Sequence, residues 1–133
     1  MKRILSICLA VLCLLGFAGC AQEEEIVENT YQQITPQEAK HLMDTEENYI
    51  ILDARTEEEF AEGHIENAIL MPEYEVADRA EAELPDKDML ILVYCRSGRR
   101  SKIAAEALAE LGYTNVKEFG GIIDWPYDIT TED

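Results

Sequence analysis

One short segment combines a nucleophilic side chain with several cationic ones. Cys95 opens a run that contains three arginines: Cys95, Arg96, Ser97, Gly98, Arg99, Arg100 and Ser101. The apolar residues 89–94 precede it and predict a strand, and residues 99–111 have a helical pattern. Cys95 should therefore lie at a strand end, in a loop whose backbone N–H groups and helix dipole favour negative charge. Such surroundings stabilise a thiolate, the reactive form of cysteine, and predict a nucleophile in an anion-binding loop.

The overall charge of the chain makes this segment stand out. The 133 residues include 11 Lys and Arg against 28 Asp and Glu, for a net charge of −17. Such an acidic chain disfavours nucleic acid and anionic lipid headgroups as partners. Four of its few basic residues nevertheless lie within seven positions of Cys95: Arg96, Arg99, Arg100 and Lys102. A basic patch on a solvated helix end is the alternative interpretation, but the cysteine among these residues favours an anion site.

The first 19 residues are typical of a targeting segment. Lys2 and Arg3 precede the apolar residues 4–15, a run shorter than the roughly 20 residues of a membrane-spanning helix. Residues 17–20, Phe-Ala-Gly-Cys, resemble a bacterial lipobox, although leucine is usual where Phe17 stands. We expect residues 1–19 to be a lipoprotein signal peptide and Cys20 to carry a lipid that anchors the protein to a bacterial membrane outside the cytoplasm. An ordinary signal peptide cut near Ala18 or Cys20 is the alternative.

Removal of this segment changes the number of thiols. Cys8 and Cys13 would leave with it, and a lipidated Cys20 would leave Cys95 as the sole thiol of the mature protein. Disulfide exchange needs a second cysteine and is therefore not expected. His41 and His64 are the only histidines, and no cluster of metal ligands surrounds them, so we expect neither a metal nor a cofactor. A buried, inert cysteine is the alternative for Cys95.

The remaining chain divides into an acidic tether (20–30), one domain (31–128) and an acidic C-terminal tail (129–133). Two capping boxes, Thr35 with Glu38 and Thr56 with Glu59, each predict a helix start. Expected helices cover 36–46, 57–63, 74–83 and 99–111, and expected strands cover 49–53, 68–71, 89–94 and 115–119. Strands separated by helices imply an α/β sandwich with a parallel sheet. Sites in such sheets lie at the carboxyl ends of strands, where Asp53 and Cys95 both fall.

Several motifs together resemble the single-domain rhodaneses. The Cys95–Ser101 segment is followed by Leu-Ala-Glu-Leu-Gly-Tyr at 108–113, and the other matching motifs are Leu52–Arg55, Glu59-Phe60, Gly63–Ile65, Pro72, Gly120–Ile122 and Trp125. The match runs from about Tyr31 to Tyr127. Two positions depart from the family pattern: Glu66-Asn67 replaces the more usual Pro-Gly, and Leu70 stands where asparagine is frequent. The resemblance implies a three-layer α/β/α sandwich around a central parallel sheet.

The resemblance also implies a chemistry and roles for individual residues. Cys95 would take sulfur from thiosulfate or a similar anion, carry it as a persulfide, and pass it to cyanide or a thiol. Backbone N–H groups of residues 96–101 would hold the persulfide, and an arginine directly after the cysteine, here Arg96, is similar to thiosulfate-type enzymes. Of the next two arginines we expect Arg99 to face the pocket and Arg100 to face solvent.

Asp53 and Arg55 resemble the family's Asp-x-Arg motif. A structural role is the preferred interpretation for both residues. The alternative places Asp53 at the pocket rim and pairs Arg55 with Glu58 or Glu59, one helical turn further on.

Three other functions remain open at this point. A cysteine phosphatase uses a similar loop but places arginine six residues after the cysteine, where this chain has Ser101. Arsenate reduction is a related possibility. A non-catalytic binding or sulfur-carrier module on the same fold differs more fundamentally, because fold alone does not decide function. No apolar surface stripe is evident, so we expect a monomer.

Overall fold

The structure is a computed structural model that describes residues 30–132. Residues 1–29 and 133 lie outside this range, and with them the expected signal peptide, Cys20 and almost all of the tether. No helix between residues 30 and 132 combines the length and the apolar character needed to cross a membrane.

The centre of the domain is a parallel sheet, as the alternation of apolar runs and helices predicted. Its strands are β1 (Gln32–Gln33), β2 (Tyr49–Asp53), β3 (Ile69–Leu70), β4 (Leu90–Cys95) and β5 (Val116–Gly121). They lie in the order β1-β5-β4-β2-β3, and every pair is parallel. All six residues of β4 are buried, as expected for a central strand covered on both faces. β1, at the edge, was not predicted, because its two residues are polar and carry no apolar pattern.

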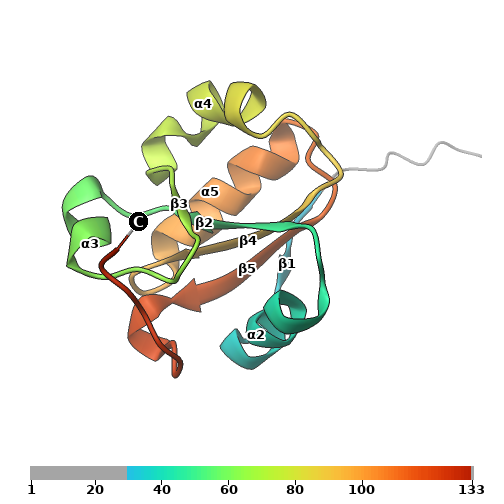
Figure 1. Ribbon diagram of the computed structural model, residues 1–133. Coiled ribbons are helices and arrows are strands. Elements are labelled where there is room, and N and C mark those ends of the chain that lie inside the picture. The colour runs from blue at the N-terminus through green and yellow to red at the C-terminus, as the bar shows by residue number, and fades with distance from the viewer. Residues whose placement is uncertain (1–29, 133) are drawn as a thin grey trace, which may run out of the picture.

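Helices cover both faces of this sheet, which gives the expected three layers (Figure 1). α4 (Val76–Glu83) and α5 (Arg99–Glu110) pack on one face, and α2 (Pro36–Thr45) packs on the other. α3 (Glu57–Glu62) lies beyond the carboxyl ends of the strands (Figure 1). Two short 3-10 turns, η3 (Glu73–Glu75) and η4 (Ile122–Asp124), complete the chain. The carboxyl edge of the sheet thus faces α3.

The starts of α2 and α3 are fixed by the predicted capping boxes. The Thr35 hydroxyl accepts the Glu38 N–H at 3.0 Å, and the Glu38 carboxylate accepts the Thr35 N–H at 2.9 Å. Thr56 and Glu59 form the same reciprocal pair. Each box satisfies backbone donors that the first helical turn leaves without partners.

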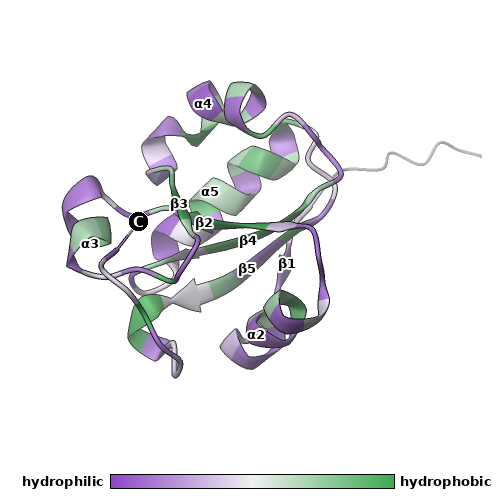
Figure 2. Cartoon of the chain, in the orientation of Figure 1, coloured by the Kyte–Doolittle hydropathy of each residue, from purple (hydrophilic) through white to green (hydrophobic). Residues whose placement is uncertain are grey.

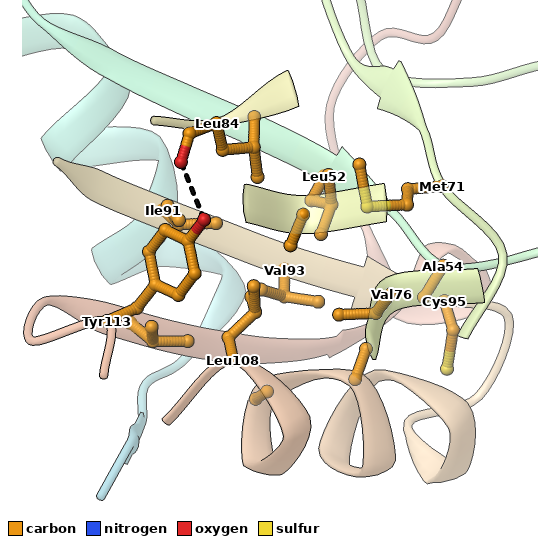
Figure 3. Close-up of a cluster of buried hydrophobic side chains, with 14 residues drawn as sticks. Leu52, Ala54, Met71, Val76, Leu84, Ile91, Val93, Cys95, Leu108 and Tyr113 are labelled. Atoms are coloured by element: carbon orange, nitrogen blue, oxygen red, sulfur yellow. Dashed lines mark hydrogen bonds between the residues drawn. The ribbon is translucent and has the colours of Figure 1, made fainter. Parts of the chain in front are cut away.

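Alternation along β4 divides the core into two clusters. Ile91, Val93 and Cys95 face α4 and α5, whereas Leu92 and Tyr94 face α2. Apolar residues follow the strands and polar residues cover much of the outer helix surfaces (Figure 2). Cys95 lies at one end of the first cluster, beside Ala54 and Val76 (Figure 3). The core therefore holds the backbone of Cys95 in place.

The pairing of β4 with β5 shifts beside Cys95. Val93 pairs with Glu118, but Cys95 pairs with Gly121, so β5 contains one more residue than β4 between these two pairs. An extra residue of this kind is a β-bulge, which bends a strand and redirects side chains. This bulge places residues 118–121 against the Cys95 loop.

The segment expected as an acidic tail packs on the domain. Thr130 forms an antiparallel bridge with His64. The His64 Nδ1 lies 2.8 Å from the Phe60 carbonyl oxygen, and its Nε2 lies 3.1 Å from that of Glu132. His64 is buried and joins the end of α3 to this segment, which is a structural role.

Candidate functional site

The Cys95 sulfur lies at the junction of β4 and α5, as predicted. Its Sγ accepts the Gly98 backbone N–H at 3.0 Å, and the residue is 1% exposed. Gly98 has a φ of +108° and directly precedes the first residue of α5. Glycine adopts this left-handed conformation without the strain that a side chain would bring. The turn at Gly98 thus points a backbone donor at the sulfur.

The loop also packs very closely on β5. A Cβ at Gly121 would lie 2.0 Å from the Arg96 carbonyl oxygen, so only glycine fits there. The same carbonyl accepts the Ile123 N–H at 3.2 Å. The loop that carries Cys95 is therefore held by the end of β5 as well as by its own helix.

Ser101 connects the cysteine to a buried carboxylate. Its Oγ lies 3.3 Å from the Cys95 Sγ and 2.5 Å from the Glu118 Oε2. Glu118 is 2% exposed, and its Oε2 also accepts the Gly120 N–H at 2.9 Å. Ser101 was a predicted site residue, but Glu118 was missed. The sequence does contain a signal for the burial of Glu118: alternation in β5 puts it on the same face of the sheet as the apolar Val116.

Arg99, which was expected to face the pocket, is exposed, whereas Arg100 is half-buried and paired with Glu59. The Arg100 Nη1 and Nη2 donate to the two carboxylate oxygens of Glu59 at 2.7 and 2.9 Å. These bonds, opposed by partial burial and supported by Thr56, lower the pKa of Glu59 to about 2. The Arg100 pKa is raised, first by Glu59 and also by the charge of Cys95. Arg99 is exposed, because one step along the helix turns it away from α3.

The other loop cations lie at the surface. Arg96, Arg99 and Lys102 are all exposed, as is the Ser97 side chain. They follow the buried Cys95 within seven residues of sequence, on a protein whose overall charge is strongly negative. A local positive rim of this kind attracts small anions to the loop by long-range electrostatics.

Asp53 and Arg55 form a buried network behind the site and do not form an exposed rim. Asp53 is fully buried and Arg55 is 5% exposed. The Arg55 Nη2 donates to the Asp53 Oδ2 at 2.7 Å and to the Gly63 carbonyl at 2.7 Å. The Tyr94 hydroxyl donates to the same Oδ2 at 2.6 Å, and burial followed by the Asp53 charge raises the Tyr94 pKa. The alternative pairing of Arg55 with Glu58 or Glu59 is wrong, because Asp53 holds Arg55.

The chemistry available at this site is that of a cysteine nucleophile and an anion. Within residues 30–132, no group of three or more His, Cys, Asp or Glu side chains could hold a metal ion. A loop with a sulfur, an aimed N–H group and a neighbouring guanidinium suits covalent attack on a negatively charged substrate.

Known proteins share this fold and sequence pattern. Thiosulfate sulfurtransferase PspE of Escherichia coli (strain K12) is 41% identical over 73 residues, which cover 55% of this chain and 70% of that protein. Thiosulfate sulfurtransferase GlpE of Coxiella burnetii is 32% identical over 104 residues, which cover 77% of this chain and 94% of that protein.

A solved structure and a family model agree with these relatives. The structure of a rhodanese with anions from E. coli superposes with a TM-score of 0.59 at 36% identity, covering 63% of this chain and 99% of that one. The sequence model of the rhodanese-like domain matches residues 35–126. That match includes β2, the Cys95 loop and β5, and the chain therefore belongs to the rhodanese-like domain family.

Proposed function

We propose that this protein transfers sulfur from thiosulfate, or a similar small anionic donor, to cyanide or a thiol through a persulfide on Cys95. One observation carries the proposal: the Cys95 sulfur accepts the Gly98 N–H of the loop at 3.0 Å. The Arg100 guanidinium is near enough for the charge of that sulfur to contribute to its raised pKa. The thiosulfate sulfurtransferases among the relatives support the same choice of donor.

The reaction proceeds by two displacements at sulfur. The Cys95 thiolate attacks the outer sulfur of thiosulfate, a new S–S bond forms, and sulfite leaves with the electron pair of the old one. Cyanide or a thiolate then attacks the outer sulfur of the persulfide, and the electron pair of that S–S bond returns to Cys95. Division of one transfer into two easier steps is the general advantage of a covalent intermediate.

The surrounding residues stabilise the negative charge in both steps. The Gly98 N–H is aimed at the position where charge resides on sulfur, and Arg100 is held at a fixed place by Glu59. Donors that are already oriented stabilise a transition state without reorganisation. Ser101 is buried at the position where a cysteine phosphatase would need arginine, which favours sulfur over a phosphoryl group as the transferred unit.

The test is the mass of the protein after treatment with thiosulfate. The full-length chain should gain one sulfur atom, on the peptide that contains Cys95, and cyanide should remove it. The Cys95→Ala chain is the matched control and should gain nothing at this peptide. A persulfide that forms but resists cyanide and small thiols would favour a carrier for one protein partner. No gain of sulfur on a folded protein would refute the proposal.

We also propose that the protein works outside the cytoplasm on a lipid anchor at Cys20. The lipobox-like residues 17–20 after an apolar segment support this location. Labelling of cells with a fatty-acid analogue should mark the protein, and Cys20→Ala should abolish the label and release the protein from membranes. A label that survives in Cys20→Ala would contradict the proposal.

A further inference from the structure

Glu118 is a buried carboxylate with an unusual set of neighbours. It is 2% exposed, and no ion pair within residues 30–132 includes it. Its Oε2 contacts the Ser101 hydroxyl and the Gly120 N–H. A buried charge that lacks a counter-ion is energetically unfavourable unless hydrogen bonds compensate it.

In the part of the chain that the structure describes, the groups near Glu118 carry charges of both signs, and none forms an ion pair with it. The Tyr31 hydroxyl lies near enough for the Glu118 charge to raise its pKa, after burial, with Glu106 adding to the same effect. Lys102 and Asp124 line the pocket that also contains Glu118, and they carry opposite charges. The Ser101 hydroxyl thus contacts both the Glu118 carboxylate and the Cys95 sulfur, and it links the two groups.

Ser101 has a single hydroxyl proton and four neighbouring groups that can accept it: the Glu118 carboxylate, the Cys95 sulfur, and the carbonyl oxygens of Gly98 at 3.2 Å and Gly120 at 3.4 Å. Of these four groups, the carboxylate and the sulfur are the two that can change their own protonation state. The Ser101 Oγ lies 2.5 Å from the Glu118 Oε2 and 3.3 Å from the Cys95 Sγ, a normal distance for a bond to sulfur. An ionised Glu118 takes the hydroxyl proton, which leaves Ser101 as the acceptor of a Cys95 thiol. A protonated Glu118 instead donates to Ser101, whose hydroxyl proton then points at a Cys95 thiolate.

We propose that Cys95 and Glu118 share one proton through Ser101, so that Glu118 receives the thiol proton when the nucleophile ionises. This inference rests on the proposed function of Cys95. The S–H bond breaks with its electron pair left on sulfur, the proton passes to the Ser101 Oγ, and the hydroxyl proton of Ser101 passes to the Glu118 Oε2. The products are a thiolate, an unchanged hydroxyl and a neutral carboxyl, and the total charge is the same before and after.

This transfer moves one negative charge to the place where it is best stabilised. On sulfur the charge meets the Gly98 N–H and the nearby Arg100 guanidinium, whereas Asp53, on the other side of the site, is paired with Arg55. Two adjacent buried negative charges are avoided throughout. Glu118 also lines a pocket of about 280 Å³, through which its proton could exchange with solvent.

The proposal is tested by the fraction of Cys95 thiolate as a function of pH. Thiolate is measured by its ultraviolet absorbance in the full-length protein, after subtraction of the same protein with Cys95→Ala. Two groups that share a proton titrate in two coupled steps, so the wild type should show two rises separated by a plateau. Glu118→Gln keeps a polar contact with Ser101 but accepts no proton, and should show a single rise. Glu106→Gln, which removes an exposed carboxylate from α5, is the matched control and should keep both rises.

A wild-type curve with one rise that superposes on that of Glu118→Gln would overturn the proposal. If Glu118→Gln fails to fold, Ser101→Ala replaces it: loss of the bridging hydroxyl should reduce the low-pH rise at least fivefold, and an unchanged rise would overturn the proposal. The titration uses no sulfur donor, so it is independent of the mass experiment. Two rises in a protein that takes no sulfur would refute sulfur transfer and support proton sharing.

Discussion

The two strands that flank β4 each carry a buried carboxylate near their carboxyl ends, and the two have opposite surroundings. Asp53, on β2, is fully buried and is held by the Arg55 guanidinium and the Tyr94 hydroxyl. Glu118, on β5, is 2% exposed, and its hydrogen-bond donors within residues 30–132 are neutral, from Ser101 and Gly120. The sulfur of Cys95 lies between a charge-compensated side and an uncompensated one.

This difference separates a structural role from a chemical one. On the β2 side, Arg55 neutralises Asp53 and Glu59 neutralises Arg100, so each charge fixes a neighbour. On the β5 side, Glu118 accepts from Ser101 and Gly120 but forms no ion pair within residues 30–132, and this is the arrangement on which the proposed proton sharing depends. Burial alone therefore does not decide whether a carboxylate has a structural or a chemical role; its charged partners decide that.

The largest effect is expected from Asp53→Asn. This substitution leaves the Arg55 guanidinium buried without a counter-charge, and removal of one partner of a buried pair costs about 3–5 kcal/mol. The free energy of unfolding from urea titration measures the loss, with Glu58→Gln, at an exposed position of α3, as the control. A loss below about 1 kcal/mol would show that Arg55 finds another partner, and would remove the contrast between the two sides.

Arg100→Met tests which loop arginine meets the donor. Loss of a charged hydrogen-bond donor is worth at least about 1.5 kcal/mol, so the thiosulfate concentration for half-maximal persulfide formation should rise about tenfold or more. The same substitution at the exposed Arg99 should have an effect several-fold smaller. If both substitutions raised this thiosulfate concentration equally, Arg99 would also contact the donor, and the assignment of that role to Arg100 would be contradicted.

Glu59→Gln should lower the free energy of unfolding by about 1 kcal/mol near neutral pH, the scale of a partly exposed ion pair. The Glu59 pKa of about 2 in the folded protein lies below its ordinary value of 4.5, so the unfolded state binds this proton more readily. The contribution is fully present above about pH 4.5 and is lost as the pH falls toward 2. The difference in stability between wild type and variant should shrink over that range. A difference independent of pH would show that the pair does not stabilise the fold.

Glu118→Gln should have the smallest effect on stability, within about 1 kcal/mol of wild type. The amide still accepts from Ser101, and the substitution leaves no cation behind. Urea titration beside Asp53→Asn makes the comparison direct. A loss near that of Asp53→Asn would show that Glu118 is also a structural carboxylate.

Much of the fold could be predicted because its signals are local. The capping boxes at Thr35 and Thr56 lie within four residues of sequence, and the apolar runs of β2 and β4 are continuous. β3 proved shorter than expected, and β1 carries no pattern at all, since an edge strand of two polar residues is defined only by its partner.

The site was predicted only where it is contiguous in sequence. Cys95, Gly98 and Ser101 belong to one loop, so their proximity follows from their spacing. Arg100 meets Glu59 across 41 residues, and Ser101 meets Glu118 across 17, so these contacts depend on the packing of separate elements. The preference for Arg99 failed for this reason, because the carboxylate that orients Arg100 comes from α3.

The bulge in β5 has a consequence for anyone who would move this site to another scaffold. Gly121 packs against the Arg96 carbonyl oxygen too closely for any Cβ, and the extra residue between Glu118 and Gly121 sets where that contact falls. A graft of the Cys95 loop alone would therefore collide with the recipient's strand. The transferable module is a pair of segments, residues 95–101 and 118–121, which must be exchanged together.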